Sequence, residues 1–131
     1  MYKLLLFPHS HFCEKARWAL DHSGSSYKTI PVVPGLHVLT VKRHCKETSV
    51  PVLLGKGLAI QGSGAIIDYV DSKMSQNQLN QTSEVSRQKA INLEKEMDQN
   101  LGENLRIVLY STLLSYPDSV SYTHLTLPTK A

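Results

Sequence analysis

The pattern of apolar and polar positions along the first seventy residues predicts alternating strands and helices. Continuous apolar runs bounded by glycine or proline predict buried strands, and apolar positions at steps of three and four predict helices. In chain order the predicted elements are a strand at 2–7, a helix at 10–22, a strand at 27–33, a short irregular helix within 36–47, strands at 50–54 and 58–60, and a helix from 63. The first two strands, joined through a helix, are expected to pair in parallel, and the last two, joined by a glycine turn, in antiparallel fashion. The result is a mixed sheet covered by helices, of the α/β class.

Beyond residue 75 the character of the sequence changes. Residues 76–83 are polar and uncharged and predict a linker. Residues 84–117 predict one long helix with an apolar face. The apolar positions of that face are Ala90, Leu93, Met97, Leu101, Leu105, Val108 and Thr112. Residues 118–131 show no period and predict an unstructured tail. We therefore expect a folded domain over 1–75 and a long helix with one uncovered side.

Composition and charge exclude several classes of function. The chain of 131 residues is 41% hydrophobic and 19% charged, has a formal net charge of +3, and carries no run of Lys and Arg that stands out. These values are typical of a soluble globular protein and give no indication of nucleic-acid binding. No apolar stretch approaches the roughly eighteen residues of a membrane span, and the N-terminus lacks a signal-peptide core and cleavage site. We expect a cytoplasmic protein without a membrane partner.

Cysteine and histidine usage predicts no metal site. Cys13 and Cys45 have no second cysteine nearby, and without a secretion signal they are expected to stay reduced. The six histidines are scattered and match no zinc-ligand spacing.

The first candidate for chemistry is the turn between the first predicted strand and helix. This turn places Ser10 and Cys13 three residues apart at a helix N-terminus. Free backbone N–H groups and the helix dipole favour an anion there, which suits the activation of a bound thiol. The alternative is that Ser10 only caps the helix and that Cys13 is a small packed residue.

Two further candidates stand before a strand and a helix. Val50-Pro51 occupies a strand entry, and a cis bond there would hold the Val50 backbone outward, so that a peptide-like ligand could pair with it. Ser63 begins a helix, so its hydroxyl and the nearby N–H groups could hold a carboxylate. The alternatives are an ordinary trans proline and a plain N-cap.

Three blocks of sequence, in this order and at these distances, resemble the N-terminal domain of the glutathione transferases. The blocks are SHFCEKARWAL at 10–20, SVPVL at 49–53 and SGAIIDY at 63–69. The resemblance covers residues 4–73 and implies a thioredoxin-like mixed sheet with the order βαβαββα. The stretch 84–117 resembles the first helix of the family's all-helical second domain, whose other helices are missing. Residues 121–131 resemble translated adapter sequence, so we expect a truncated gene product; a genuine disordered tail is the alternative.

The resemblance also implies roles for single residues. Ser10 falls where serine-type members keep the hydroxyl that donates to the glutathione thiolate. Val50 and Pro51 match the element that pairs with the cysteinyl backbone of glutathione, and Ser63 matches the serine that binds its γ-glutamyl carboxylate. Many members have an acidic residue before that serine, whereas this chain has Gly62, which puts the affinity for glutathione in question; Gln61 could supply a neutral acceptor.

The implied function is the conjugation of glutathione, as co-substrate, to a small electrophile, a detoxification reaction of a full-length homodimer. The electrophile would sit against the missing helices, so the truncated chain itself can be inactive. One alternative makes Cys13 the working thiol of a glutathione-dependent thiol–disulfide reaction. A second alternative is a non-catalytic binding module with the same fold, which Gly62 favours slightly.

Overall fold

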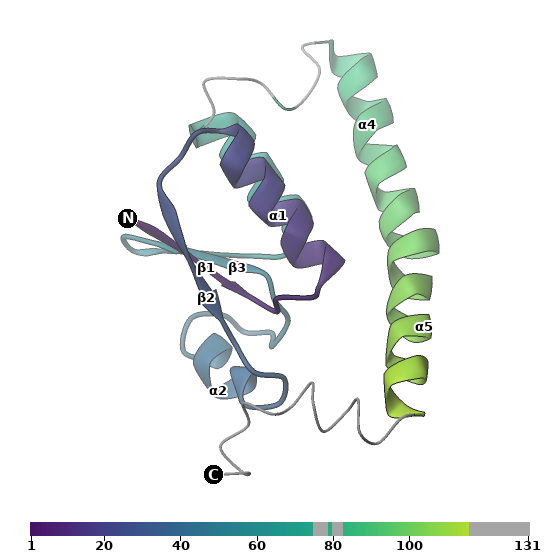
Figure 1. Cartoon of the computed structure of the whole chain (residues 1–131). Helices are drawn as coiled ribbons and strands as arrows, with labels where there is room; N and C mark the ends of the chain where they lie inside the picture. The colour runs from purple at the N-terminus through teal and green to yellow at the C-terminus, as the bar shows by residue number, and fades with distance from the viewer. Residues whose placement is uncertain (75–78, 80–82, 116–131) are drawn as a thin grey trace. The chain divides into compact units, whose positions relative to one another are not determined.

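A computed structural model describes residues 1–74, 79 and 83–115 of the chain (Figure 1). The chain divides into two compact units, residues 1–80 and 81–131.

The first unit is built on a four-stranded mixed sheet with the strand order β2-β1-β3-β4. The strands are β1 (Tyr2–Leu6), β2 (Tyr27–Pro31), β3 (Val52–Gly55) and β4 (Leu58–Gln61). β1 pairs with β2 in parallel and with β3 in antiparallel fashion, and β3 and β4 form an antiparallel hairpin. The predicted α/β class and both predicted pairings are confirmed.

The two strand boundaries that differ most from the sequence prediction both lie at a proline, and the other differences are of one residue. The strand predicted at 27–33 ends at Pro31, and the strand predicted at 50–54 begins at Val52, directly after Pro51. Proline has no N–H group to donate to a ladder, so each marks an end of regular pairing.

Three helices cover the sheet. They are α1 (His11–His22), α2 (His37–Lys42) and α3 (Ser63–Tyr69), and α3 continues into a π-helical turn at Val70–Met74. α1 begins at its predicted cap, Ser10, and its chain turns away at Gly24, whose φ of +69° favours glycine. The irregular segment predicted within 36–47 contains only the six-residue α2.

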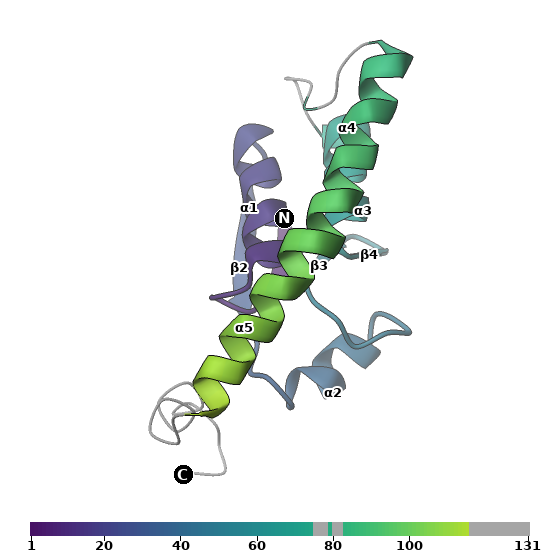
Figure 2. The same cartoon turned by 90° about the vertical axis from the view of Figure 1, so that its right-hand side faces the viewer.

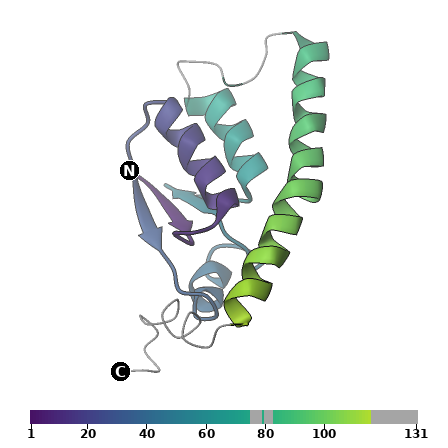
Figure 3. The ribbon, with the colours of Figure 1, turned by 45° about the vertical axis from the view of Figure 1, so that its right-hand side comes forward.

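The alternation of side chains along β1 divides the core between the two faces of the sheet. Leu4 and Leu6 point into the larger cluster with α1 and α3, which lie side by side (Figure 3). Leu5 points the other way, into a smaller cluster with Val41 of α2. Figure 2 shows α2 apart from the α1–α3 pair.

The described part of the second unit, residues 83–115, is one long helical run. α4 (Glu84–Met97) passes through a π-helical turn (Asp98–Gly102) into α5 (Glu103–Leu114). Helix therefore covers residues 84–114 of the predicted stretch 84–117, with a π-turn that the apolar period did not indicate; the tail predicted at 118–131 lies outside the described residues. Five apolar side chains of the predicted face are between 49% and 60% exposed, namely Leu93, Met97, Leu101, Leu105 and Val108. Within the described part of the chain, no helix has the length and apolar character to cross a membrane.

Candidate functional site

The strand directions bring the predicted site residues to one edge of the sheet. β1 runs antiparallel to β3, and β3 antiparallel to β4, so the end of β1, the start of β3 and the end of β4 share an edge. β1 leads through a turn into α1 (Figure 3). Ser10 lies in this turn as the N-cap of α1. Val50 and Pro51 precede β3, while Gln61 ends β4 and Ser63 begins α3. Three segments that are far apart in the sequence therefore meet at this edge.

Ser10 caps α1 and keeps a proton that it can donate. Its backbone is extended, with φ −89° and ψ 124°, and its Oγ accepts a hydrogen bond from the Cys13 N–H at 3.4 Å. The Ser10 N–H donates to the Phe7 carbonyl at 3.2 Å, which fixes the turn. A hydroxyl that accepts one bond still has its own O–H to donate, so capping and binding an anion are compatible.

Cys13 lies in the core rather than at the site. Its side chain is completely buried, within the cluster between the sheet and α1. Burial raises the pKa of the Cys13 thiol, against the opposing effect of the hydrogen bonds with Ser10 and the Phe7 backbone. A buried thiol that stays protonated is a poor nucleophile.

The Val50–Pro51 segment is fastened to the start of α3. The Val50–Pro51 bond is cis, which rules out the alternative of an ordinary trans proline. The Pro51 carbonyl accepts a hydrogen bond from the Gly62 N–H at 2.9 Å. The Gln61 side chain adds a second link, because its Nε2 donates to the Ser49 carbonyl at 2.7 Å. The second and third candidate motifs thus form one connected structure.

Gly62 and Ser63 together begin α3. Gly62 has a φ of +94°, and its carbonyl accepts the first helical bond from Ile66 at 3.0 Å. An added Cβ at Gly62 would meet no atom within 4 Å, so the positive φ, and not a lack of space, favours glycine here. Ser63 is buried, with 6% of its surface exposed.

Two histidines near the edge carry features that the sequence did not reveal. The His37 ring packs edge-on against Phe7, with centroids 4.8 Å apart, and its Nδ1 accepts a hydrogen bond from the Gly35 N–H at 3.1 Å. His11 follows Ser10 directly, and its Nε2 is buried without a hydrogen-bond partner among the described residues. Neither lies in a recognisable motif; the Pro34-Gly35 turn before His37 was the one available signal. Over the same residues, no group of three or more His, Cys, Asp or Glu side chains is arranged to hold a metal ion.

The mixed sheet, with α1 and α3 on one face and a cis-proline at the start of β3, defines the domain as thioredoxin-like. Residues 4–78 match the sequence profile described as "Glutathione S-transferase, N-terminal domain". This match covers more than half of the chain, so the protein belongs to the glutathione S-transferase family. No curated protein matches the chain.

Solved structures of this family share the fold. One is glutathione S-transferase from Methylobacterium radiotolerans in complex with glutathione sulfonate (26% identity, TM-score 0.68). The match covers 74% of this chain and 46% of the relative's chain. A second is a glutathione S-transferase from Rhodospirillum rubrum (19% identity, TM-score 0.74), and the match covers 99% of this chain and 63% of the relative's chain. A third is a glutathione transferase homolog from Burkholderia GL BGR1 with bound glutathione (19% identity, TM-score 0.68), and the match covers 87% of this chain and 64% of the relative's chain. The chain therefore spans less than two thirds of the length of each of these relatives.

Proposed function

We propose that the full-length protein is a glutathione-dependent transferase in which Ser10 stabilises the thiolate of bound glutathione. The observation that carries this proposal is the meeting of Ser10, Val50-Pro51 and Ser63 at one edge of the sheet. A γ-glutamyl tripeptide has a thiol, peptide groups and carboxylates, and the edge offers a partner for each. The relatives from Methylobacterium radiotolerans and Burkholderia, which hold glutathione sulfonate and glutathione, support this choice of ligand.

The thiol step requires only a donor and a favourable field. The Ser10 hydroxyl donates a hydrogen bond to the thiolate sulfur, and the N-terminus of α1 adds its partial positive charge. Both favour the ionised thiol, so the proton leaves to solvent and the sulfur attacks an electrophilic carbon as the leaving group departs. Loss of one such donor typically lowers turnover by about a hundred- to a thousandfold.

The rest of the edge would hold the tripeptide along its length. The Val50 backbone would pair with the cysteinyl peptide group, and the Ser63 hydroxyl would bind the γ-glutamyl carboxylate. Gly62 offers no carboxylate for the γ-glutamyl ammonium, and the Nε2 of Gln61 is committed to Ser49, which leaves its Oε1 as a neutral acceptor. We therefore propose weaker glutathione binding than an acidic residue at position 62 would give.

His37 would add a contact at the other end of the ligand. Because its Nδ1 accepts from Gly35, the neutral ring carries its proton on Nε2 and can donate it to a ligand carboxylate. Its packing on Phe7 places it next to the turn that leads to Ser10.

Two alternative functions are judged by different observations, one at Cys13 and one at Gly62. Thiol–disulfide chemistry at Cys13 is disfavoured, because this thiol is buried and its pKa is raised. The second alternative is a non-catalytic binding module with the same fold, and Gly62 favours it because glycine supplies no carboxylate for the γ-glutamyl ammonium. The same proposal concerns the full-length protein in four further respects. These are a small electrophile as second substrate, a homodimer, a cytoplasmic location and a role in detoxification.

The deciding experiment measures glutathione binding and turnover together. Isothermal titration of the full-length protein with glutathione tests binding, and conjugation to a generic aromatic electrophile tests catalysis. Binding with turnover supports the transferase, and binding without turnover supports the binding module. Activity that survives Ser10→Ala and is lost in Cys13→Ser would overturn the role of Ser10.

A further inference from the structure

Most acidic side chains of the first unit lie on the helices that cover one face of the sheet, where Lys15, Arg17 and Lys73 accompany them. Within residues 1–74, four of the five acidic residues lie on α1, on α3 or on its π-helical extension; these are Glu14, Asp21, Asp68 and Asp71. The fifth, Glu47, lies in the connection between α2 and β3. The face that α2 covers has a different charge.

Two lysines extend this face beyond α2. Lys3 and Leu5 are two residues apart on β1, as are Lys28 and Ile30 on β2, so each lysine shares a side of the sheet with an apolar residue of the α2 cluster. Lys3 and Lys28 are partners in the parallel register, and both are exposed. Like charges in adjacent register positions repel each other, and an anion bound over them would relieve this cost.

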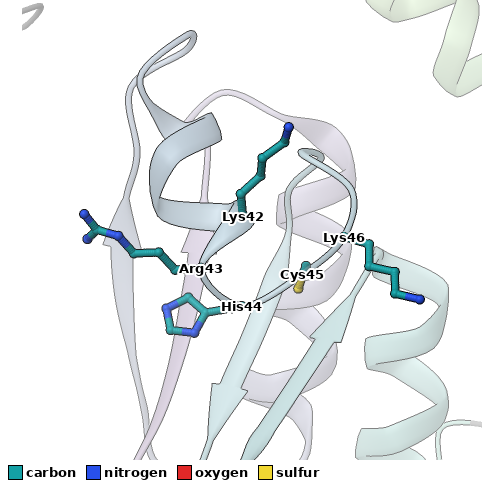
Figure 4. Close-up of a pocket in the computed structure, with 5 residues that line it drawn as sticks. All are labelled: Lys42, Arg43, His44, Cys45 and Lys46. Carbon is teal, nitrogen blue, oxygen red and sulfur yellow. The ribbon is translucent and has the colours of Figure 1, made fainter.

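The end of α2 adds four more basic side chains. Lys42, Arg43, His44 and Lys46 are all exposed and line a hollow of about 430 Å³ together with Cys45 (Figure 4). Cys45 is half-buried against the α2 cluster and holds the loop on the sheet. In Figure 4 the Arg43 and Lys46 side chains extend toward opposite sides, so the charges are spread rather than converging on one point.

We call the six residues Lys3, Lys28, Lys42, Arg43, His44 and Lys46 the basic face. Within residues 1–74, 79 and 83–115, none of the six forms an ion pair. No described carboxylate is therefore paired with the basic face, and Glu47, which follows Lys46 in the same loop, is the acidic residue next to it in the sequence.

We propose that the basic face is a docking surface for an acidic segment of a partner protein. A spread row of cations matches an extended polyanion better than a compact anion, which needs converging donors. Two exposed leucines of the same helix region, Leu36 and Leu39 (42% and 68% exposed), add apolar contact next to the charges. Leucines suit a peptide that alternates acidic and apolar residues, whereas single-stranded nucleic acid is bound on aromatic platforms. Leu39 on the six-residue α2 and Leu36 at its N-cap are a small apolar area for insertion into a membrane.

The test uses the whole chain and a defined probe. The probe is a fluorescein-labelled polyglutamate peptide with leucine at every fourth position. Its binding to the protein is measured by fluorescence anisotropy at low salt. The test variant is Lys42→Gln/Arg43→Gln/Lys46→Gln. The matched control is Arg87→Gln/Lys89→Gln/Lys95→Gln, which removes the same charge from exposed positions of α4. Circular dichroism checks that both variants are folded.

The proposal expects the peptide to bind, with an affinity that falls as salt is raised. The test variant should bind the peptide about three- to a hundredfold more weakly, because it loses three exposed charge pairs that each contribute modestly to affinity. The affinity of the control variant should be unchanged. Leu39→Ser should weaken binding without altering the salt dependence. Equal losses in test and control variants, absence of binding, or tighter binding to oligothymidine or to phosphatidylserine vesicles would each overturn it. Glutathione titration of the same variants keeps this outcome separate from that of the proposed transferase function.

Discussion

The Gly62 N–H donates a 2.9 Å hydrogen bond to the Pro51 carbonyl, so the start of α3 and the cis-proline segment are held as one structure. The bond requires the Gly62 N–H to point back toward β3 while its carbonyl accepts from Ile66. The φ of +94° at Gly62 is part of that geometry. The residue that departs from the family's acidic pattern is thus also the one that connects two parts of the proposed glutathione site.

Substituting Gly62 should therefore destabilise the domain. A residue with a Cβ at this φ is strained by about 1–3 kcal/mol, although the space around it is open. Gly62→Ala is expected to lower the midpoint of urea unfolding accordingly. Gly64→Ala is the control, because Gly64 lies within α3 without a positive φ, and alanine is favoured in helices. Equal stability of Gly62→Ala and the parent would contradict the strain argument.

The two functions of Ser10 can be separated with two substitutions. Ser10→Ala removes both the cap and the hydroxyl donor and should cost about 0.5–2 kcal/mol of stability, whereas Ser10→Gly keeps most of the cap energy. Both variants should raise the pKa of the thiol of bound glutathione, measured by the ultraviolet absorbance of the thiolate during a pH titration. If only Ser10→Ala raises that pKa, the effect comes from the helix end and not from the hydroxyl.

The two cysteines should differ in reactivity. Cys13 is completely buried and Cys45 half-buried, and burial raises the pKa of both thiols. Iodoacetamide at mildly alkaline pH should label Cys45 first and reach Cys13 only on unfolding, as peptide mass spectrometry would show. Because the folded-state pKa of Cys13 is raised, its contribution to stability is present below the unfolded pKa and is lost as the pH rises through the folded one. Faster labelling of Cys13 than of Cys45 in the folded protein would restore Cys13 as a candidate nucleophile.

The local sequence predicted those parts of the fold that depend on local chemistry. The Ser10 cap and the glycine turn of the hairpin are examples, since each rests on the preferences of a few neighbouring residues. The local sequence shows Gly62 only as the absence of an acid, because its positive φ accompanies a hydrogen bond to Pro51, eleven positions away. The contact of His37 with Phe7 and the pairing of Lys3 with Lys28 likewise depend on tertiary placement. In the basic face, Lys42, Arg43, His44 and Lys46 are neighbours in the sequence, whereas Lys3 and Lys28 join each other only through the pairing of β1 with β2.

The apolar face of the α4–α5 run predicts self-association of the 131-residue chain. Its five large side chains are 49% to 60% exposed, and burying one contributes about 1.5–3 kcal/mol. Contiguous exposed apolar surface of this kind favours association. Leu101→Glu/Leu105→Glu is expected to shift the chain toward the monomer in size-exclusion chromatography at raised concentration. Asn100→Glu/Asn104→Glu is the matched control, because it adds the same charge at neighbouring exposed polar positions. A parent chain that elutes as a monomer at every concentration, or a control that dissociates as far as the test variant, would show that the apolar face does not drive association.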